Sequence, residues 1–103
     1  AKRLLSEARF ADVLMRSRGE RFGAARIGQE MRAHRLPDEL VRTAVGELRK
    51  SELERARALW QRRFGAVAAD RDGRIRQMRF LAGRGFSGEV IRKVVGGDED
   101  DPD

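Results

Sequence analysis

The sequence has no cysteine, no tyrosine, two prolines and one histidine among its 103 residues. Without cysteine the chain has no disulfide, no thiolate nucleophile and no cysteine-ligated zinc. A lone His34 gives neither a Ser–His–Asp set nor a metal site, because no carboxylates are grouped around it; we expect it to be exposed at a helix end. We therefore expect a protein that is not an enzyme and that has no catalytic residue, no metal and no cofactor.

Long apolar runs are also missing. The longest are far too short to span a bilayer, and no apolar segment of the secretory kind follows Lys2 and Arg3. Apolar residues still make up 40% of the chain, which is enough for a packed core. A chain of this length has room for one domain or for a short row of small repeats. We expect a folded, cytoplasmic protein.

Acidic residues are few outside the C-terminus. Five of the 17 lie in 98–103, DEDDPD, so the rest of the chain has all 23 basic residues against 12 acidic ones, a formal charge of +11. Twenty of the 23 are arginines, which a codon bias explains as readily as a function does. Such a body is nevertheless attracted to DNA, RNA or an acidic protein surface, and the planar arginine fork suits phosphate and carboxylate groups. We expect residues 97–103 to form a disordered acidic tail.

Apolar residues recur at helical spacing in six windows, and no window shows the period-two alternation of a strand. The pattern predicts an all-α chain, with Pro37 near the first turn of the third helix and with Trp60 and Phe64 in the core rather than on a base-stacking platform. The six stripes are Leu5, Ala8, Ala11, Leu14 and Met15; Ala24, Ile27 and Met31; Leu40, Val41, Ala44, Val45 and Leu48; Leu53, Ala56, Trp60 and Phe64; Ile75, Met78, Leu81 and Ala82; and Val90, Ile91, Val94 and Val95.

The acidic residues within these windows are scattered among arginines at helical spacing. That arrangement is typical of ion pairs on a helix surface, so we expect no catalytic carboxylate among them. The set is Asp12, Glu30, Glu39, Glu47, Glu52 and Glu54.

The six windows form two triplets that a shift of 50 residues brings into register. Core positions match in kind, as Phe10 with Trp60 and Met31 with Leu81 do, and Gly23 matches Gly73. We predict two tandem three-helix repeats, residues 1–50 and 51–96, in an elongated, curved array of either hand, each repeat depending on its neighbour to bury its apolar faces.

Residues 83–88, GRGFSG, contain a G-x-G-x-x-G, the pattern of a dinucleotide-binding turn. That turn needs a preceding strand, whereas the residues before Gly83 have helical spacing, and the equivalent residues 33–38, AHRLPD, lack glycine. The motif instead predicts a corner between two helices. Gly85 would end one helix in the left-handed conformation, Ser87 would cap the next, and Phe86 and Ile91 would form a hydrophobic staple.

Three segments resemble the RecX family, bacterial regulators of the RecA recombinase. Residues 76–87, RQMRFLAGRGFS, are similar to the basic helix and Arg-Gly-aromatic corner of its last repeat. Residues 26–31, RIGQEM, resemble its Arg-Ile-x-x-Glu-Leu helix, and residues 5–11, LSEARFA, resemble the entry to its middle repeat. The resemblance covers about residues 5–95, as the second and third repeats. Two features depart from the family: Arg35 stands where a glycine is usual, and a further upstream repeat is absent, as in a fragment or the ordered part of a longer protein.

The resemblance implies a regulator that binds the RecA–DNA filament, lies in its helical groove and inhibits ATP hydrolysis, filament extension and strand exchange, and so modulates recombination, DNA repair and the SOS response. It also implies a monomer, with the RecA filament as partner and single- or double-stranded DNA as a further one. The alternatives are a basic helical module that binds nucleic acid without RecA, and a purely structural fragment of a larger assembly.

Arginines are the candidate contacts for the filament or for DNA. They are concentrated in the first loop and the second helix, and the arrangement is repeated downstream in the second triplet. Any one of them, taken alone, is more often a solvated surface residue than a contact. The candidate set is Arg16, Arg18, Arg21, Arg26, Arg32, Arg35, Arg71, Arg74, Arg76, Arg79 and Arg84.

Overall fold

The computed structural model describes residues 2–96, with side chains from residue 6 onward. All secondary structure in this range is helical, which confirms the all-α prediction. The elements are α1 Lys2–Arg18, α2 Ala24–Ala33, α3 Asp38–Lys50, α4 Glu52–Arg63, α5 Arg71–Gly83, α6 Gly88–Ile91 and the π-helical turn η1 Arg92–Gly96, which continues α6. The expected acidic tail, 97–103, lies outside the described residues.

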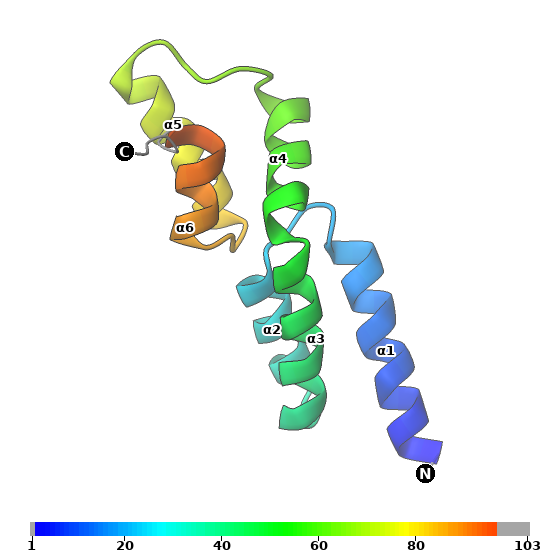
Figure 1. Ribbon diagram of the computed structural model, residues 1–103. Coiled ribbons are helices and arrows are strands. Elements are labelled where there is room, and N and C mark those ends of the chain that lie inside the picture. The colour runs from blue at the N-terminus through cyan, green and yellow to red at the C-terminus, as the bar shows by residue number, and fades with distance from the viewer. Residues whose placement is uncertain (1, 97–103) are drawn as a thin grey trace.

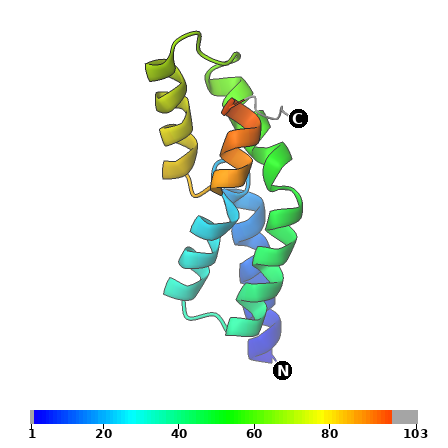
Figure 2. The same ribbon diagram turned by 60° about the vertical axis from the view of Figure 1, so that its left-hand side comes forward.

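The helices form an elongated molecule of 53 × 27 × 18 Å. Only Ser51 separates α3 from α4, and the two helices follow one another along the length of the molecule (Figure 1). Helices α1 and α2 pack with α3 at one end, and α5, α6 and η1 pack with α4 at the other (Figures 1 and 2). The predicted elongation is confirmed.

Buried apolar side chains form two separate cores, one for each group of helices. Trp60 lies in the second core and Phe64 packs against it, as predicted. Among the predicted stripe residues from Ala8 onward, whose burial the structure describes, Ala82 is the exception, because it is exposed. The first core contains Ala11, Leu14, Ala24, Ile27, Met31, Leu36, Val41, Ala44 and Leu48, and the second contains Ala56, Leu59, Trp60, Leu81, Phe86, Ile91, Val94 and Val95.

Gln77 is a polar residue buried beside the second core, 5% exposed, that the apolar pattern of α5 did not predict. Its Oε1 accepts a hydrogen bond from Trp60 Nε1 at 3.2 Å, and its Nε2 donates to the carbonyl of Ala66 at 2.9 Å. A buried amide is tolerated when its polar atoms find partners. Gln77 therefore connects α5 to α4 and to the loop between them.

The corner predicted from GRGFSG is confirmed. Gly85 has φ +89°, the Ser87 side chain accepts a hydrogen bond from Val90 N at 3.2 Å, and Phe86 and Ile91 are both buried. No atoms approach the positions that side chains would take at Gly83, so this glycine is tolerated rather than required.

The equivalent corner of the first repeat uses different residues. Arg35 takes the left-handed conformation at φ +61° without the freedom of glycine. Pro37 lies at the N-cap of α3, one residue before its first turn. His34 is exposed at the end of α2, as expected, and its ring meets Phe10 edge-on at 4.9 Å between centroids.

Candidate interaction surface at the repeat junction

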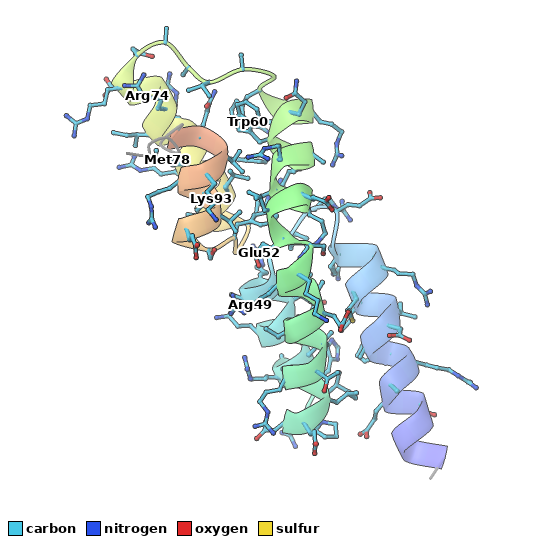
Figure 3. The ribbon with its side chains drawn as sticks, viewed as in Figure 1. Arg49, Glu52, Trp60, Arg74, Met78 and Lys93 are labelled. Carbon is cyan, nitrogen blue, oxygen red and sulfur yellow. The ribbon has the colours of Figure 1, made fainter. Side chains whose placement is uncertain are left out.

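Glu52 joins the two groups of helices at the first residue of α4. Its side chain is 2% exposed. One carboxylate oxygen accepts a hydrogen bond from Ala24 N at 3.2 Å, at the start of α2, and the other accepts one from Ser87 N at 2.8 Å, just before α6. Figure 3 shows Glu52 at the level where the two groups meet.

The prediction of a surface role for Glu52 was therefore wrong. Helical spacing predicts which face of a helix a residue occupies. It does not predict that the start of α2, in the other repeat, packs over the first turn of α4. The surface pattern does hold for Glu30, which pairs with Arg18 at 3.1 Å, and for Glu47, which pairs with Lys50 at 3.2 Å.

Arg55 holds the loop between α1 and α2 against the junction. Its Nη1 donates to the carbonyls of Gly19 and Phe22 at 2.7 and 2.8 Å, and its Nη2 donates to that of Leu48 at 2.8 Å. Burial lowers the pKa of the Arg55 guanidinium, and the neighbouring Glu52 carboxylate raises it. The group remains protonated at any ordinary pH, so these bonds are charge-assisted.

Two glycines bring the repeats into backbone contact. The N–H of Gly23 donates to the carbonyl of Arg84 at 2.7 Å. A Cβ at Gly23 would overlap the Gly85 carbonyl, and a Cβ at Gly85 would overlap Arg26 Cβ. Neither position has room for a side chain, so the junction is a direct contact between the α1–α2 loop and the α5–α6 corner.

Arginine and phenylalanine side chains alternate along the surface at this junction. The guanidinium carbon of Arg84 lies 5.4 Å from the ring centroid of Phe22 and 4.9 Å from that of Phe80. Arg26 lies over Phe22 at 4.5 Å, and Arg63 lies over Phe80 at 4.8 Å. We call this series the arginine–phenylalanine ladder; in spatial order it consists of Arg26, Phe22, Arg84, Phe80, Arg63 and Phe64.

The cations of the ladder have no acidic partners among the described residues. Arg26 donates to the carbonyl of Gly83 at 2.9 Å, which fixes it across the junction. Arg26 and Arg63 are exposed and Arg84 is half-buried. Stacking on a ring immobilises a guanidinium while leaving N–H groups on its edge free for an anion.

A hollow of about 500 Å³ opens at the Arg26 end of the ladder. It is lined by Arg18, Phe22, Arg26, Gln29 and Glu30. The Glu30 carboxylate is paired with Arg18, as described above, so the cation of Arg26 is the charge in this hollow without an acidic partner.

The structure gathers only part of the predicted arginine set at one place. Arg26 and Arg84 belong to the ladder, with Arg18 beside it, whereas Arg74 donates to the carbonyls of Ala68 and Ala69 and so orders the α4–α5 loop. The other predicted arginines are exposed. The carbonyl of Arg21 accepts a hydrogen bond from Arg84 Nη1 at 3.5 Å, which joins its backbone to the ladder. The remaining side chains make no hydrogen bond or ring contact with the ladder: Arg16, Arg32, Arg35, Arg71, Arg76 and Arg79.

Sequence reasoning missed Arg63 and the three ladder rings. The comparison of repeats could not find them, because the counterparts of Arg63 and Arg84 at the shift of 50 are Val13 and His34. A signal was present nonetheless. Each ladder phenylalanine directly follows an arginine, at residues 21–22, 63–64 and 79–80.

The described residues offer neither a metal-ion site nor a membrane-spanning helix. They contain no group of three or more His, Asp or Glu residues placed to hold a metal ion. None of the helices in this part of the chain has the length and apolar character needed to cross a membrane.

Comparison with known proteins decides the family. Residues 6–45 match the second three-helix domain of RecX, and residues 50–95 match the third. The chain is 48% identical over 95 residues to the regulatory protein RecX of Leptothrix cholodnii, and 39% identical over 103 residues to that of Herminiimonas arsenicoxydans. This chain belongs to the RecX family. The alignments cover 92% and 100% of the chain, respectively.

The RecX relatives are longer than this chain. It spans 60% of the Leptothrix protein, 58% of the RecX of Ralstonia nicotianae, to which it is 41% identical, and 68% of the Herminiimonas protein. The RecX domains matched are the second and third, in the order predicted from the sequence. The ladder lies where these two domains meet.

Proposed function

We propose that this chain regulates RecA by binding the RecA–DNA filament, and that it inhibits ATP hydrolysis, filament extension and strand exchange. It acts as a monomer in the cytoplasm, in recombination, DNA repair and the SOS response, and it is not an enzyme. The observation that carries the proposal is the match of both three-helix domains to RecX, whose curated members are named regulatory proteins. An elongated body of 53 Å suits contact with several neighbouring subunits of a filament.

The electrostatics support the same proposal. The body of the chain is strongly basic, and the ladder presents cations without acidic partners at its centre. A basic surface increases the rate of association with a polyanion such as a DNA-containing filament. The predicted arginine set, together with Arg63, is the proposed contact surface.

The experiment measures the rate of ATP hydrolysis by RecA on single-stranded DNA while this protein is added in increasing, sub-stoichiometric amounts. We expect the rate to fall and the protein to co-sediment with filaments. Unchanged hydrolysis together with no co-sedimentation would contradict the proposal.

A helix–turn–helix mode of DNA reading is poorly supported by the third helix of each repeat. Val41, Ala44 and Leu48 of α3 are buried in the first core, and Ile91, Val94 and Val95 are buried in the second. On α6 and η1 only Glu89, Arg92 and Lys93 remain to reach the edges of bases. The exposed side chains of α3 include the acidic Asp38, Glu39 and Glu47, which the phosphates of DNA repel.

A further inference from the structure

We infer that the arginine–phenylalanine ladder is a binding site for a strand of single-stranded nucleic acid. The inference rests on the proposed function and deepens it, because it names the DNA strand as the filament component that this surface contacts. It depends on the geometry of the ladder, on its lack of acidic partners and on its position across both repeats.

The spacing of the ladder suits a linear anion. Arg26 and Arg84 share the ring of Phe22, and Arg84 and Arg63 share the ring of Phe80. Two cations that share a ring can be no further apart than the sum of their distances to its centroid. Successive phosphates of one strand can therefore reach successive arginines.

The ladder is also held in place before any ligand arrives. Arg26 is fixed by its bond to the Gly83 carbonyl, and Phe64 meets Phe80 edge-on at 5.5 Å between centroids. Phe64 and Phe80 both pack against the second core. A site whose side chains are already ordered loses less conformational entropy on binding.

Stacked arginines favour a nucleic acid strand over an acidic protein. A carboxylate uses only the N–H edge of a guanidinium, whereas a nucleotide offers a phosphate to that edge and a base that can stack on an aromatic or guanidinium plane. In a duplex the bases are already stacked on each other, so a single strand is the better match. Contact with bases through their faces makes the site tolerant of sequence.

The test measures binding of a fluorescent oligothymidylate to the purified protein without RecA, by anisotropy over a range of salt concentrations. We expect binding whose affinity falls with salt with a log–log slope of several units. The double variant Arg63→Lys/Arg84→Lys keeps the charge but loses the planar fork, and we expect about a tenfold weaker affinity. Phe80→Leu removes a shared ring without changing charge and should weaken binding by a similar factor.

Arg42→Lys is the matched control, because Arg42 is exposed on α3 outside the ladder. It should bind within about twofold of the unaltered protein. Unfolding in urea is measured for each variant, so that only variants with unaltered stability are compared; the Arg→Lys pair serves if Phe80→Leu is unstable.

Ladder variants that bind oligothymidylate as tightly as Arg42→Lys would overturn the inference. So would equal or tighter binding of a duplex of the same length, or displacement of the oligothymidylate by polyglutamate at equal charge concentration. Inhibition of RecA by a protein that does not bind DNA alone would overturn the inference and leave the proposed function standing. DNA binding without any effect on RecA would overturn the proposed function and leave the DNA-binding role of the ladder standing.

Discussion

Arg35 and Gly85 occupy equivalent positions 50 residues apart, and both have left-handed backbone, with φ +61° and +89°. The demand for this conformation comes from the corner that follows each second helix. Glycine meets the demand without steric cost, whereas a residue with a Cβ is strained there. At this turn we therefore expect glycine to be favourable in place of Arg35 in the first repeat, and any other residue to be unfavourable in place of Gly85 in the second.

Arg35→Gly should stabilise the protein, by about 0.5 kcal/mol, because relief of the left-handed strain exceeds the entropy that glycine adds to the unfolded chain. Gly85→Ala should destabilise it by about 2 kcal/mol or more, since it adds the same strain and an overlap with Arg26 Cβ. Equilibrium unfolding in urea measures both. A Gly85→Ala protein as stable as the parent would show that the corner can move away from α2.

At the scale of the element, Glu52 supplies one carboxylate to the starts of two helices. The first N–H groups of a helix lack acceptors within that helix. The N–H of Ala24, in α2, donates to the carboxylate of Glu52, which lies outside its own repeat. The N–H of Ser87, at the N-cap of α6, donates to the other oxygen of the same carboxylate. The helices meeting at the junction therefore depend on a residue of α4.

Glu52→Gln should reduce the free energy of unfolding by about 1–3 kcal/mol, because the amide offers one acceptor oxygen where two N–H groups require acceptors, and the other is left buried without a partner. Glu54→Gln is the matched control, since Glu54 is exposed two residues along the same helix. The control should lie within about 0.5 kcal/mol of the parent protein. Equal effects of the two changes on the urea midpoint would contradict the role given to Glu52.

The helices were predictable from the sequence and their contacts were not. Stripes such as Ala24, Ile27 and Met31 lie fully buried where their spacing places them, because helical periodicity is a local property. The burial of Gln77 and Glu52 depends on partners far along the chain, Trp60 for the first and Ala24 and Ser87 for the second. The π-helical turn at residues 92–96 likewise has no signal in the apolar spacing.

At the scale of the whole molecule, two cores are connected through one junction. The division into repeats 1–50 and 51–96 stays a prediction, and the contacts agree with the expected dependence of each repeat on its neighbour. Glu52 bonds to α2, and Arg55 bonds to the α1–α2 loop from within α4. Each repeat is completed by its neighbour, as expected for tandem units too small to fold well alone.

We predict that the two repeats unfold in a single transition. Trp60 is the only tryptophan and lies in the second core, so its fluorescence reports on one repeat, whereas circular dichroism reports on all the helices. The two urea transitions should coincide, as two-state unfolding requires. A dichroism signal that changes at a lower urea concentration than the fluorescence would show that the first repeat unfolds independently.

The sequence by itself determined the helical class, the duplication, the corner at Gly85 and the resemblance to RecX, because each depends on residues close together in the chain or on a fixed offset. The tertiary structure alone decided which arginines act together. Arg26, Arg63 and Arg84 come from three different helices or helix ends, and the counterparts of Arg63 and Arg84 in the first repeat are Val13 and His34 rather than arginines. Their alignment on Phe22 and Phe80 results from the close approach of Gly23 and Gly85, a contact between segments about 60 residues apart that no local pattern encodes.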